Sequence, residues 1–302
     1  MKKTLIAGIT ACALVALTAC GIGKDPFSTE AGSGSSGNAI VVGSADFLES
    51  QLIATIYVEA LRAKGVEVKE KPNIGSRELY IPAIKDGSID LIPEYSGALL
   101  QYLNPDTTAT TPDEVIAALQ TELPKGLINL DPAPAEDKDV LAVREGTAKT
   151  YSLKRIEDLV PHAGELILGG PPEWKTRKNG VAGLKAVYGL TFKDFLALDA
   201  GGPLTLNALT SGQIQVADVF STDPALKNEK LVALTDTKQL FLAENITPIA
   251  NHAKVTDEVR SILNEVSGEL TTEDLIAMNA RVANLDDMHD IAKDWLASRN
   301  LP

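Results

Sequence analysis

The sequence is poor in the residues that build disulfides and metal sites. Two cysteines and three histidines occur among 302 residues. Cys12 lies in an apolar leader, so the chain beyond the leader keeps only Cys20 and forms no intrachain disulfide. The histidines, His162, His252 and His289, lack the spacing of metal ligands. We therefore expect no metal and no disulfide framework.

Motifs for common enzyme chemistry are also missing. The chain contains no nucleophile elbow, no phosphate-binding loop and no dinucleotide fingerprint. We therefore predict no catalytic residue, no cofactor and no enzymatic activity. An enzyme or a sensor built on the two-lobe fold that is predicted below stays open as an alternative, because catalytic groups can lie far apart in sequence.

Basic and aromatic residues are both scarce. Lysine and arginine number 28 against 41 acidic residues, which gives a net charge of −13. This balance disfavours nucleic acid and anionic membrane surfaces as partners through bulk charge. Aromatic residues make up 5% of the chain, so each aromatic near a presumed cleft carries more weight.

One apolar run stands at the start of the chain. It spans residues 5–17, follows two lysines and is too short for a lasting membrane span. Residues 17–20 (LTAC) resemble the bacterial lipobox, which implies a signal peptide over 1–19 and a lipid on Cys20. Residues 20–38 then form the lipidated cysteine and a flexible Gly/Ser linker. The alternative is an ordinary secretory signal with an incidental cysteine.

A repeated pattern organises the rest of the chain. Residues 69–99 read as strand, turn, helix, turn and strand, and residues 83–91 (AIKDGSIDL) correspond in type to residues 208–216 (ALTSGQIQV). The same register aligns Tyr95 with Phe220. We therefore predict two α/β lobes, each with an aromatic residue at the carboxyl end of an equivalent strand, where ligands of such sheets bind. The alternative is that two βα units merely look alike.

Two segments look like crossings between the lobes. Residues 131–139 (DPAPAEDKD) are stiffened by proline, and residues 244–250 (ENITPIA) resemble a return crossing. We predict one lobe from residues 39–138 and 246–302, closed by three C-terminal helices, and a second lobe from residues 139–245. A polar loop after the first strand holds Ser44 and Asp46. These two residues either bind a polar ligand or only cap the next helix.

Five phrases resemble the solute-binding proteins of osmoprotectant ABC importers. They are residues 43–49 (GSADFLE), 92–97 (IPEYSG), 170–173 (GPPE), 187–189 (VYG) and 220–223 (FSTD). The resemblance implies a two-lobe periplasmic-binding-protein fold of the second type, with mixed sheets flanked by helices and two hinge crossings. It also implies a monomeric, extracytoplasmic receptor that delivers glycine betaine or another quaternary amine to the permease subunits. The alternative is a receptor for a different cationic or polar small solute.

The resemblance also implies a site. A box of aromatic rings normally surrounds the ammonium by cation–π attraction, and basic and hydroxyl groups hold the carboxylate. Tyr95 and Phe220 match two walls and Arg177 matches the carboxylate clamp, whereas Asp139 and Glu244 stand at two positions where aromatic walls are expected. Such acids would favour ligands with N–H donors, unless they belong to the hinge and face water. The expected ligand-binding residues are Ser44, Asp46, Tyr95, Ser96, Asp137, Asp139, Arg177, Phe220, Thr222 and Glu244.

Each of the matched residues also has a purely structural interpretation. Tyr95 and Phe220 would then only pack in a core, and Arg177 would only form a surface salt bridge.

Overall fold

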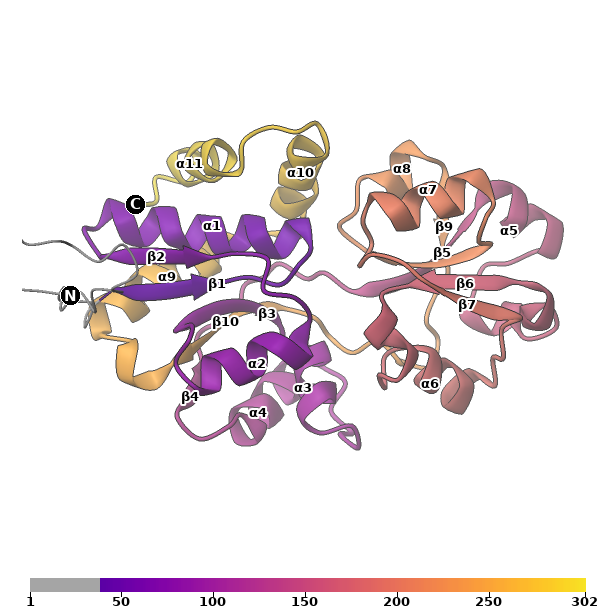
Figure 1. The fold of residues 1–302 in the computed structure, drawn as a ribbon, viewed down its shortest axis with the longest axis horizontal. Coiled ribbons are helices and arrows are strands. Elements are labelled where there is room, and N and C mark those ends of the chain that lie inside the picture. Colours follow the sequence, from indigo (N-terminus) through magenta and orange to yellow (C-terminus); the bar gives the residue numbers. More distant parts are fainter. Residues whose placement is uncertain (1–38) are drawn as a thin grey trace, which may run out of the picture. The chain divides into compact units, whose positions relative to one another are not determined.

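The computed structural model describes residues 39–302, which form two α/β lobes (Figure 1). The predicted signal peptide, Cys20 and the linker lie outside the described residues. In the part that is described, no helix is long and apolar enough to cross a bilayer.

The first lobe is built on a mixed five-stranded sheet. Its order is β2-β1-β3-β10-β4, with β1 (Ile40–Gly43), β2 (Val68–Lys71), β3 (Leu91–Tyr95), β4 (Leu127–Asn129) and β10 (Ile246–Asn251). β1 pairs in parallel with β2 and β3, and β10 runs antiparallel to β3 and β4. All five residues of β3 are buried, because helices cover both faces of the sheet.

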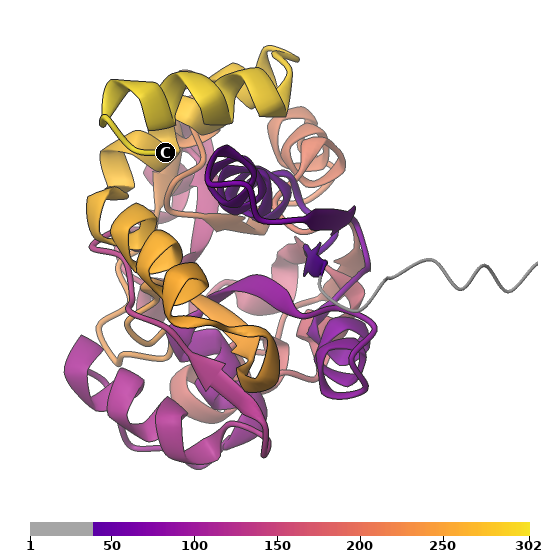
Figure 2. The same ribbon diagram turned by 90° about the vertical axis from the view of Figure 1, so that its left-hand side faces the viewer.

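The helices of the first lobe form two layers. One layer holds α1 (Leu48–Ala63), α9 (Asp257–Glu269), α10 (Thr272–Ala283) and α11 (Met288–Ser298). The other holds α2 (Arg77–Lys85), α3 (Ser96–Leu103) and α4 (Pro112–Glu122). α10 and α11 lie beside α1 in Figures 1 and 2.

The three C-terminal helices form where the apolar spacing predicted them. Side-chain oxygens of Thr256, Thr271 and Asp287 accept backbone hydrogen bonds at their first turns, which satisfies donors that have no partner inside a helix. Their apolar residues at helical spacing all lie in the core against α1: Leu263, Val266, Leu275, Met278, Ile291 and Trp295. The chain's last segment therefore completes the first lobe.

The second lobe repeats the arrangement of the first. Its sheet has the order β7-β6-β8-β5-β9, with β5 (Asp139–Arg144), β6 (Ile167–Gly170), β7 (Asp194–Ala197), β8 (Val216–Phe220) and β9 (Leu231–Ala233). Helices α5 (Glu145–Tyr151), α6 (Val181–Gly183), α7 (Pro203–Ser211) and α8 (Ala225–Asn228) surround it. Within the two sheets, β8 holds the place of β3: each has a parallel neighbour on one side and an antiparallel neighbour on the other.

Two crossings join the lobes and lie side by side. The backbone N–H of Asp137 donates to the carbonyl of Glu244 at 3.1 Å, and Glu136 forms an isolated antiparallel bridge with Asn245. The predicted two-lobe α/β fold with two crossings is therefore confirmed.

The sequence of residues 152–159 predicts one helix, and this prediction is wrong: Ser152 adopts φ 55°, ends α5 and leaves only a 3₁₀ turn at Ile156–Leu159. The alternative role of Ser44 and Asp46 as helix caps is not observed either. Neither Ser44 nor Asp46 caps α1, whose N-cap position is Phe47. The polar loop after β1 is thus longer than a simple strand-to-helix cap.

Candidate functional site

A pocket of about 60 Å³ lies between the lobes, at the carboxyl ends of β1, β3, β6 and β8. This is the edge at which ligands of open α/β sheets bind. Most of the residues expected from the sequence line it: Asp46, Tyr95, Asp137, Asp139, Arg177, Phe220 and Glu244. Further lining residues were not expected: Phe47, Arg77, Tyr80, Trp174, Asn179 and Asp218.

Three aromatic rings form one wall of the pocket. Tyr95 is the last residue of β3 and Phe220 the last of β8, as the repeat predicted. Phe47 contacts both, with ring centroids 5.7 Å from Tyr95 and 5.1 Å from Phe220. The loop before α7 reaches the Phe220 ring through Gly201, whose φ is 64° and where an added Cβ would lie 2.9 Å from the ring. The rings thus pack on one another around Phe47.

A polar network beside the rings connects the two lobes. The Tyr95 hydroxyl donates to Oε1 of Glu49 at 2.8 Å, and the Thr222 hydroxyl donates to Oε2 at 2.5 Å. Asn279 of α10 donates to the same Oε2 at 2.6 Å. Burial and the nearby Glu49 carboxylate raise the pKa of Tyr95, which therefore stays a neutral donor. Thr222 lines a neighbouring cavity of about 660 Å³ and not the pocket itself.

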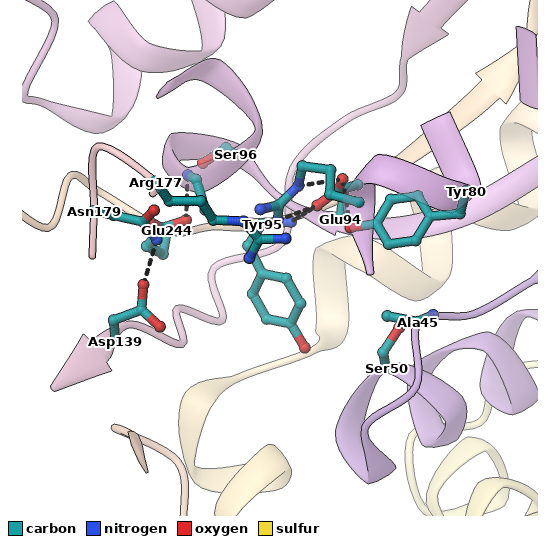
Figure 3. A network of polar contacts seen from close by, with 12 residues as sticks. Ala45, Ser50, Tyr80, Glu94, Tyr95, Ser96, Asp139, Arg177, Asn179 and Glu244 are labelled. Atoms are coloured by element: carbon teal, nitrogen blue, oxygen red, sulfur yellow. Dashed lines mark hydrogen bonds and ion pairs between the residues drawn. The ribbon is translucent and has the colours of Figure 1, made fainter. Parts of the chain in front are cut away.

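Four buried carboxyl groups also line the pocket: Asp137, Asp139, Asp218 and Glu244. Asn179 donates to Asp139 Oδ2 at 2.5 Å, and the backbone N–H of Ala98 donates to Glu244 Oε2 at 2.8 Å. Figure 3 shows Asp139, Asn179, Glu244 and Arg177 on one side of Tyr95.

The pKa of each of these four carboxyls lies above its usual range, because burial disfavours the charged form. A negatively charged neighbour raises the pKa further at three of these carboxyls. Glu49 does so for Asp137, and Asp139 does so for Asp218 and for Glu244. The acids therefore do not simply face water at the hinge.

Arg77 supplies a buried positive charge that already has a partner. Its guanidinium donates to both oxygens of Glu94, at 2.9 and 2.8 Å, and the Tyr80 hydroxyl donates to the same carboxylate at 2.9 Å. Burial opposes the charge on Arg77, but Glu94 raises its pKa well above the ordinary value. The sequence offered no signal for this pair, because its members lie on different elements, α2 and β3.

Arg177 bridges the lobes. It donates to both oxygens of Glu78 on α2, at 3.1 and 2.7 Å, while its side chain lines the pocket. Burial opposes ionisation of Glu78, but hydrogen bonds from Arg177 and Ser76 lower its pKa to about 2. The arginine expected to hold a ligand carboxylate is thus engaged in an ion pair across the cleft.

Two of the expected site residues turn away from the pocket lining. The Ser44 hydroxyl accepts from the backbone N–H of Asn73 at 2.9 Å and donates to the carbonyl of Ala45 at 3.0 Å. The Ser96 hydroxyl donates to the carbonyl of Ala243 at 3.2 Å. Both serines are buried and support the pocket walls. Across residues 39–302, no group of three or more His, Cys, Asp or Glu side chains is arranged to hold a metal ion.

The structure has two matching lobes, joined by a pair of crossings, with a pocket between them at the strand ends. These features define a two-lobed solute-binding protein of the periplasmic-binding type. Comparison with known proteins places the chain within this class. The family described as the substrate-binding domain of ABC-type glycine betaine transport systems matches residues 38–298.

Individual relatives agree with the family match. The carnitine transport binding protein OpuCC of Listeria monocytogenes is 26% identical over 275 residues, which cover 88% of this chain and 89% of the relative. A glycine-betaine-binding protein of Pseudomonas aeruginosa is 26% identical over 275 residues, covering 86% and 88%. A solved structure of a glycine betaine/carnitine/choline ABC transporter has a TM-score of 0.68 at 22% identity and covers 87% of this chain and 99% of that one.

The chain therefore belongs to the family of substrate-binding domains of ABC-type glycine betaine transport systems. This confirms the predicted family and the predicted class, the solute receptor of an ABC importer. The family consists of extracytoplasmic transport proteins that work with an ABC permease.

Proposed function

We propose that this protein captures a small organic ammonium compound, of the class that includes glycine betaine and other quaternary amines, and delivers it to an ABC permease. The pocket between two hinged lobes carries this proposal, because it places aromatic rings and acidic groups together at the strand ends. Relatives whose names state carnitine or glycine betaine binding support the same class of solute.

The lobes divide the task of holding the solute. We propose that the first lobe comprises residues 39–138 and 246–302 and contributes Tyr95 and Phe47, while the second, residues 139–245, contributes Phe220, Asp139 and Arg177. The rings attract the ammonium through their faces, and the buried acids compensate its charge. Opening and closing about the two crossings then admits and traps the solute, with ligand shifting the balance toward the closed form.

Anchoring at the membrane belongs to the same proposal. The lipobox-like residues 17–20 support cleavage of residues 1–19 and lipidation of Cys20, and residues 20–38 then form the linker. A monomer on such a linker would work close to its permease. Cys20 lies outside the described residues, so this part rests on the sequence.

A thermal-shift screen tests the function directly. The purified protein is heated with glycine betaine, choline, carnitine, ectoine, polyamines and amino acids in parallel. A solute at one hundred times its dissociation constant adds about 2.7 kcal/mol of stability. A protein that responds to none of the ammonium compounds but to an uncharged solute would contradict the proposal.

A further inference from the structure

Among the described residues, no basic side chain forms an ion pair with Asp137, Asp139, Asp218 or Glu244. The two guanidinium groups that line the pocket lower the pKa of some of these acids from a distance, but their close partners are other acids: Arg77 pairs with Glu94, and Arg177 with Glu78 and, at 3.8 Å, with Glu173. Asp137, Asp139, Asp218 and Glu244 have no basic group of the described chain within 4.0 Å. The pocket therefore holds more acidic groups than its own basic groups neutralise.

Two of these acids also lack N–H or O–H donors among the described residues. Oδ2 of Asp137 and Oδ1 of Asp218 are buried and accept no such hydrogen bond, and their residues are only 2% and 1% exposed. Each acid instead lies against another carboxyl, Glu49 beside Asp137 and Asp139 beside Asp218. Both side chains line the pocket. A buried, unpartnered carboxyl oxygen is unfavourable unless something supplies a donor. In a receptor, the group that enters the pocket is the natural source of that donor.

The sheet register places two of the acids together with an aromatic ring. In the β5–β8 ladder, Asp139 stands opposite Phe220 and Leu141 stands opposite Asp218. Because side chains alternate between the faces of a strand, Asp139, Asp218 and Phe220 share one face. A ligand held against the Phe220 ring is thus within reach of both carboxyls.

A fully methylated ammonium does not satisfy this arrangement. It has a positive charge but no N–H, so it brings no hydrogen-bond donor to the buried oxygens of Asp137 and Asp218. The rings that would hold it by cation–π attraction also pack on each other, since Phe47 contacts both Tyr95 and Phe220. An ammonium or guanidinium with N–H groups supplies both the charge and the donors.

We infer that the pocket selects small organic cations that carry N–H donors, and that Asp218, Asp139 and Asp137 are its specificity-determining acceptors. This inference rests on the proposed function and narrows its class of solute to ammonium compounds that keep at least one N–H. Burial raises the pKa of all three carboxyls, so their charged forms are disfavoured in the empty pocket, and a bound cation would favour those charged forms.

Two methylation series test the inference with the wild-type protein. The first is ethanolamine, N-methylethanolamine, N,N-dimethylethanolamine and choline, and the second is glycine, sarcosine, dimethylglycine and glycine betaine. Within each series the N–H donors fall to zero while the rest of the molecule is unchanged. Calorimetric titration of the purified full-length protein should show that affinity falls along the series, with a loss of roughly tenfold or more at the last methyl group.

Variants then assign the effect to particular acids. Asp218→Asn and Asp139→Asn should each weaken binding of the N–H compounds by roughly tenfold or more and flatten the series. Asp194→Asn is the matched control: it removes the same charge from an exposed position on β7 and should leave the series unchanged. If the pocket variants fail to fold, the wild-type series alone decides.

The outcomes separate the inference from the function on which it rests. If choline or glycine betaine binds as tightly as its less methylated partners, the inference is wrong and the receptor function stands. If no member of either series binds and carnitine does not bind either, the proposed function itself fails. A falling affinity that Asp194→Asn flattens as strongly as Asp218→Asn would overturn the assignment to the pocket acids.

Discussion

The ion pair between Arg177 and Glu78 should act as a latch that holds the closed lobes together. Glu78 lies on α2 of the first lobe and Arg177 in the loop after β6 of the second, and two hydrogen bonds join them. The pair exists only while the lobes are close. Replacing Glu78 by Gln removes the charge and keeps the size of the side chain. The stability of the open form, in which the pair is not made, should therefore change little.

The size of the effect follows from exposure. The Glu78 side chain is 41% exposed and that of Arg177 is 17% exposed. Solvent screening at this exposure limits such a pair to about 0.5–1 kcal/mol, even though the pKa of Glu78 falls to about 2. We expect Glu78→Gln to weaken binding of every solute about two- to fivefold.

The dependence on pH has a definite sign. The pKa of Glu78 is lower in the folded protein than the usual value of about 4.3 in an unfolded chain. Its contribution is therefore fully present above about pH 4.3 and is lost as the pH falls toward about 2. Between pH 5 and pH 8, the affinity difference between wild type and Glu78→Gln should stay constant.

Calorimetry and small-angle scattering together check the latch. Glu145→Gln removes the exposed Lys149–Glu145 pair within α5 and is the matched control, with no expected change in affinity. In a double-mutant cycle, Arg177→Ala should add little to Glu78→Gln. If Arg177→Ala weakens glycine betaine but spares choline, while Glu78→Gln changes neither, then Arg177 holds a ligand carboxylate and the latch argument is wrong.

Three further predictions concern the aromatic wall, the pocket acids and the anchor. Phe220→Ala should weaken binding about five- to thirtyfold with little loss of stability, because the ring is only half-buried, while Phe241→Ala, which removes a buried ring of the second lobe's core, should do the reverse. Because the pKa of Asp218 is raised in the folded protein, this group destabilises the ligand-free fold as the pH rises above about 4, so Asp218→Asn should raise the melting temperature relative to wild type more at pH 8 than at pH 4. Cys20→Ser should release the protein from membranes or leave an unprocessed precursor, and unchanged fractionation and mass would contradict lipidation.

Periodicity predicted those parts of the fold that depend on local pattern. Apolar residues at helical spacing identified the three C-terminal helices, and the repeated βα phrase put Tyr95 and Phe220 at equivalent strand ends. The latch and the Arg77–Glu94 pair were not predictable in this way. Each joins side chains from different elements, and only the packing of those elements decides which charges meet.

Asp218 is a different case, because the sequence did contain a signal for it. It stands in the middle of an apolar strand, Val216–Phe220, two residues before the predicted ligand-binding ring. The period of two in a strand puts both side chains on one face, so a ring predicted to face the ligand implies an acid facing it too. Phe47 gave a weaker signal, since it lies in an irregular loop whose direction no period determines.

The same register explains why aromatic and acidic recognition occur together in this pocket. Asp139 pairs with Phe220 across the ladder, and Asp218 lies on the same face two residues earlier. A shift by one residue would turn all three side chains to the other face at once. Their positions are therefore tied to one another by the strand pairing. If the pocket selects N–H donors as inferred above, its preferred ligand presents an apolar or cationic surface to the ring and donors to the acids at the same time, as a partly methylated or unmethylated ammonium does.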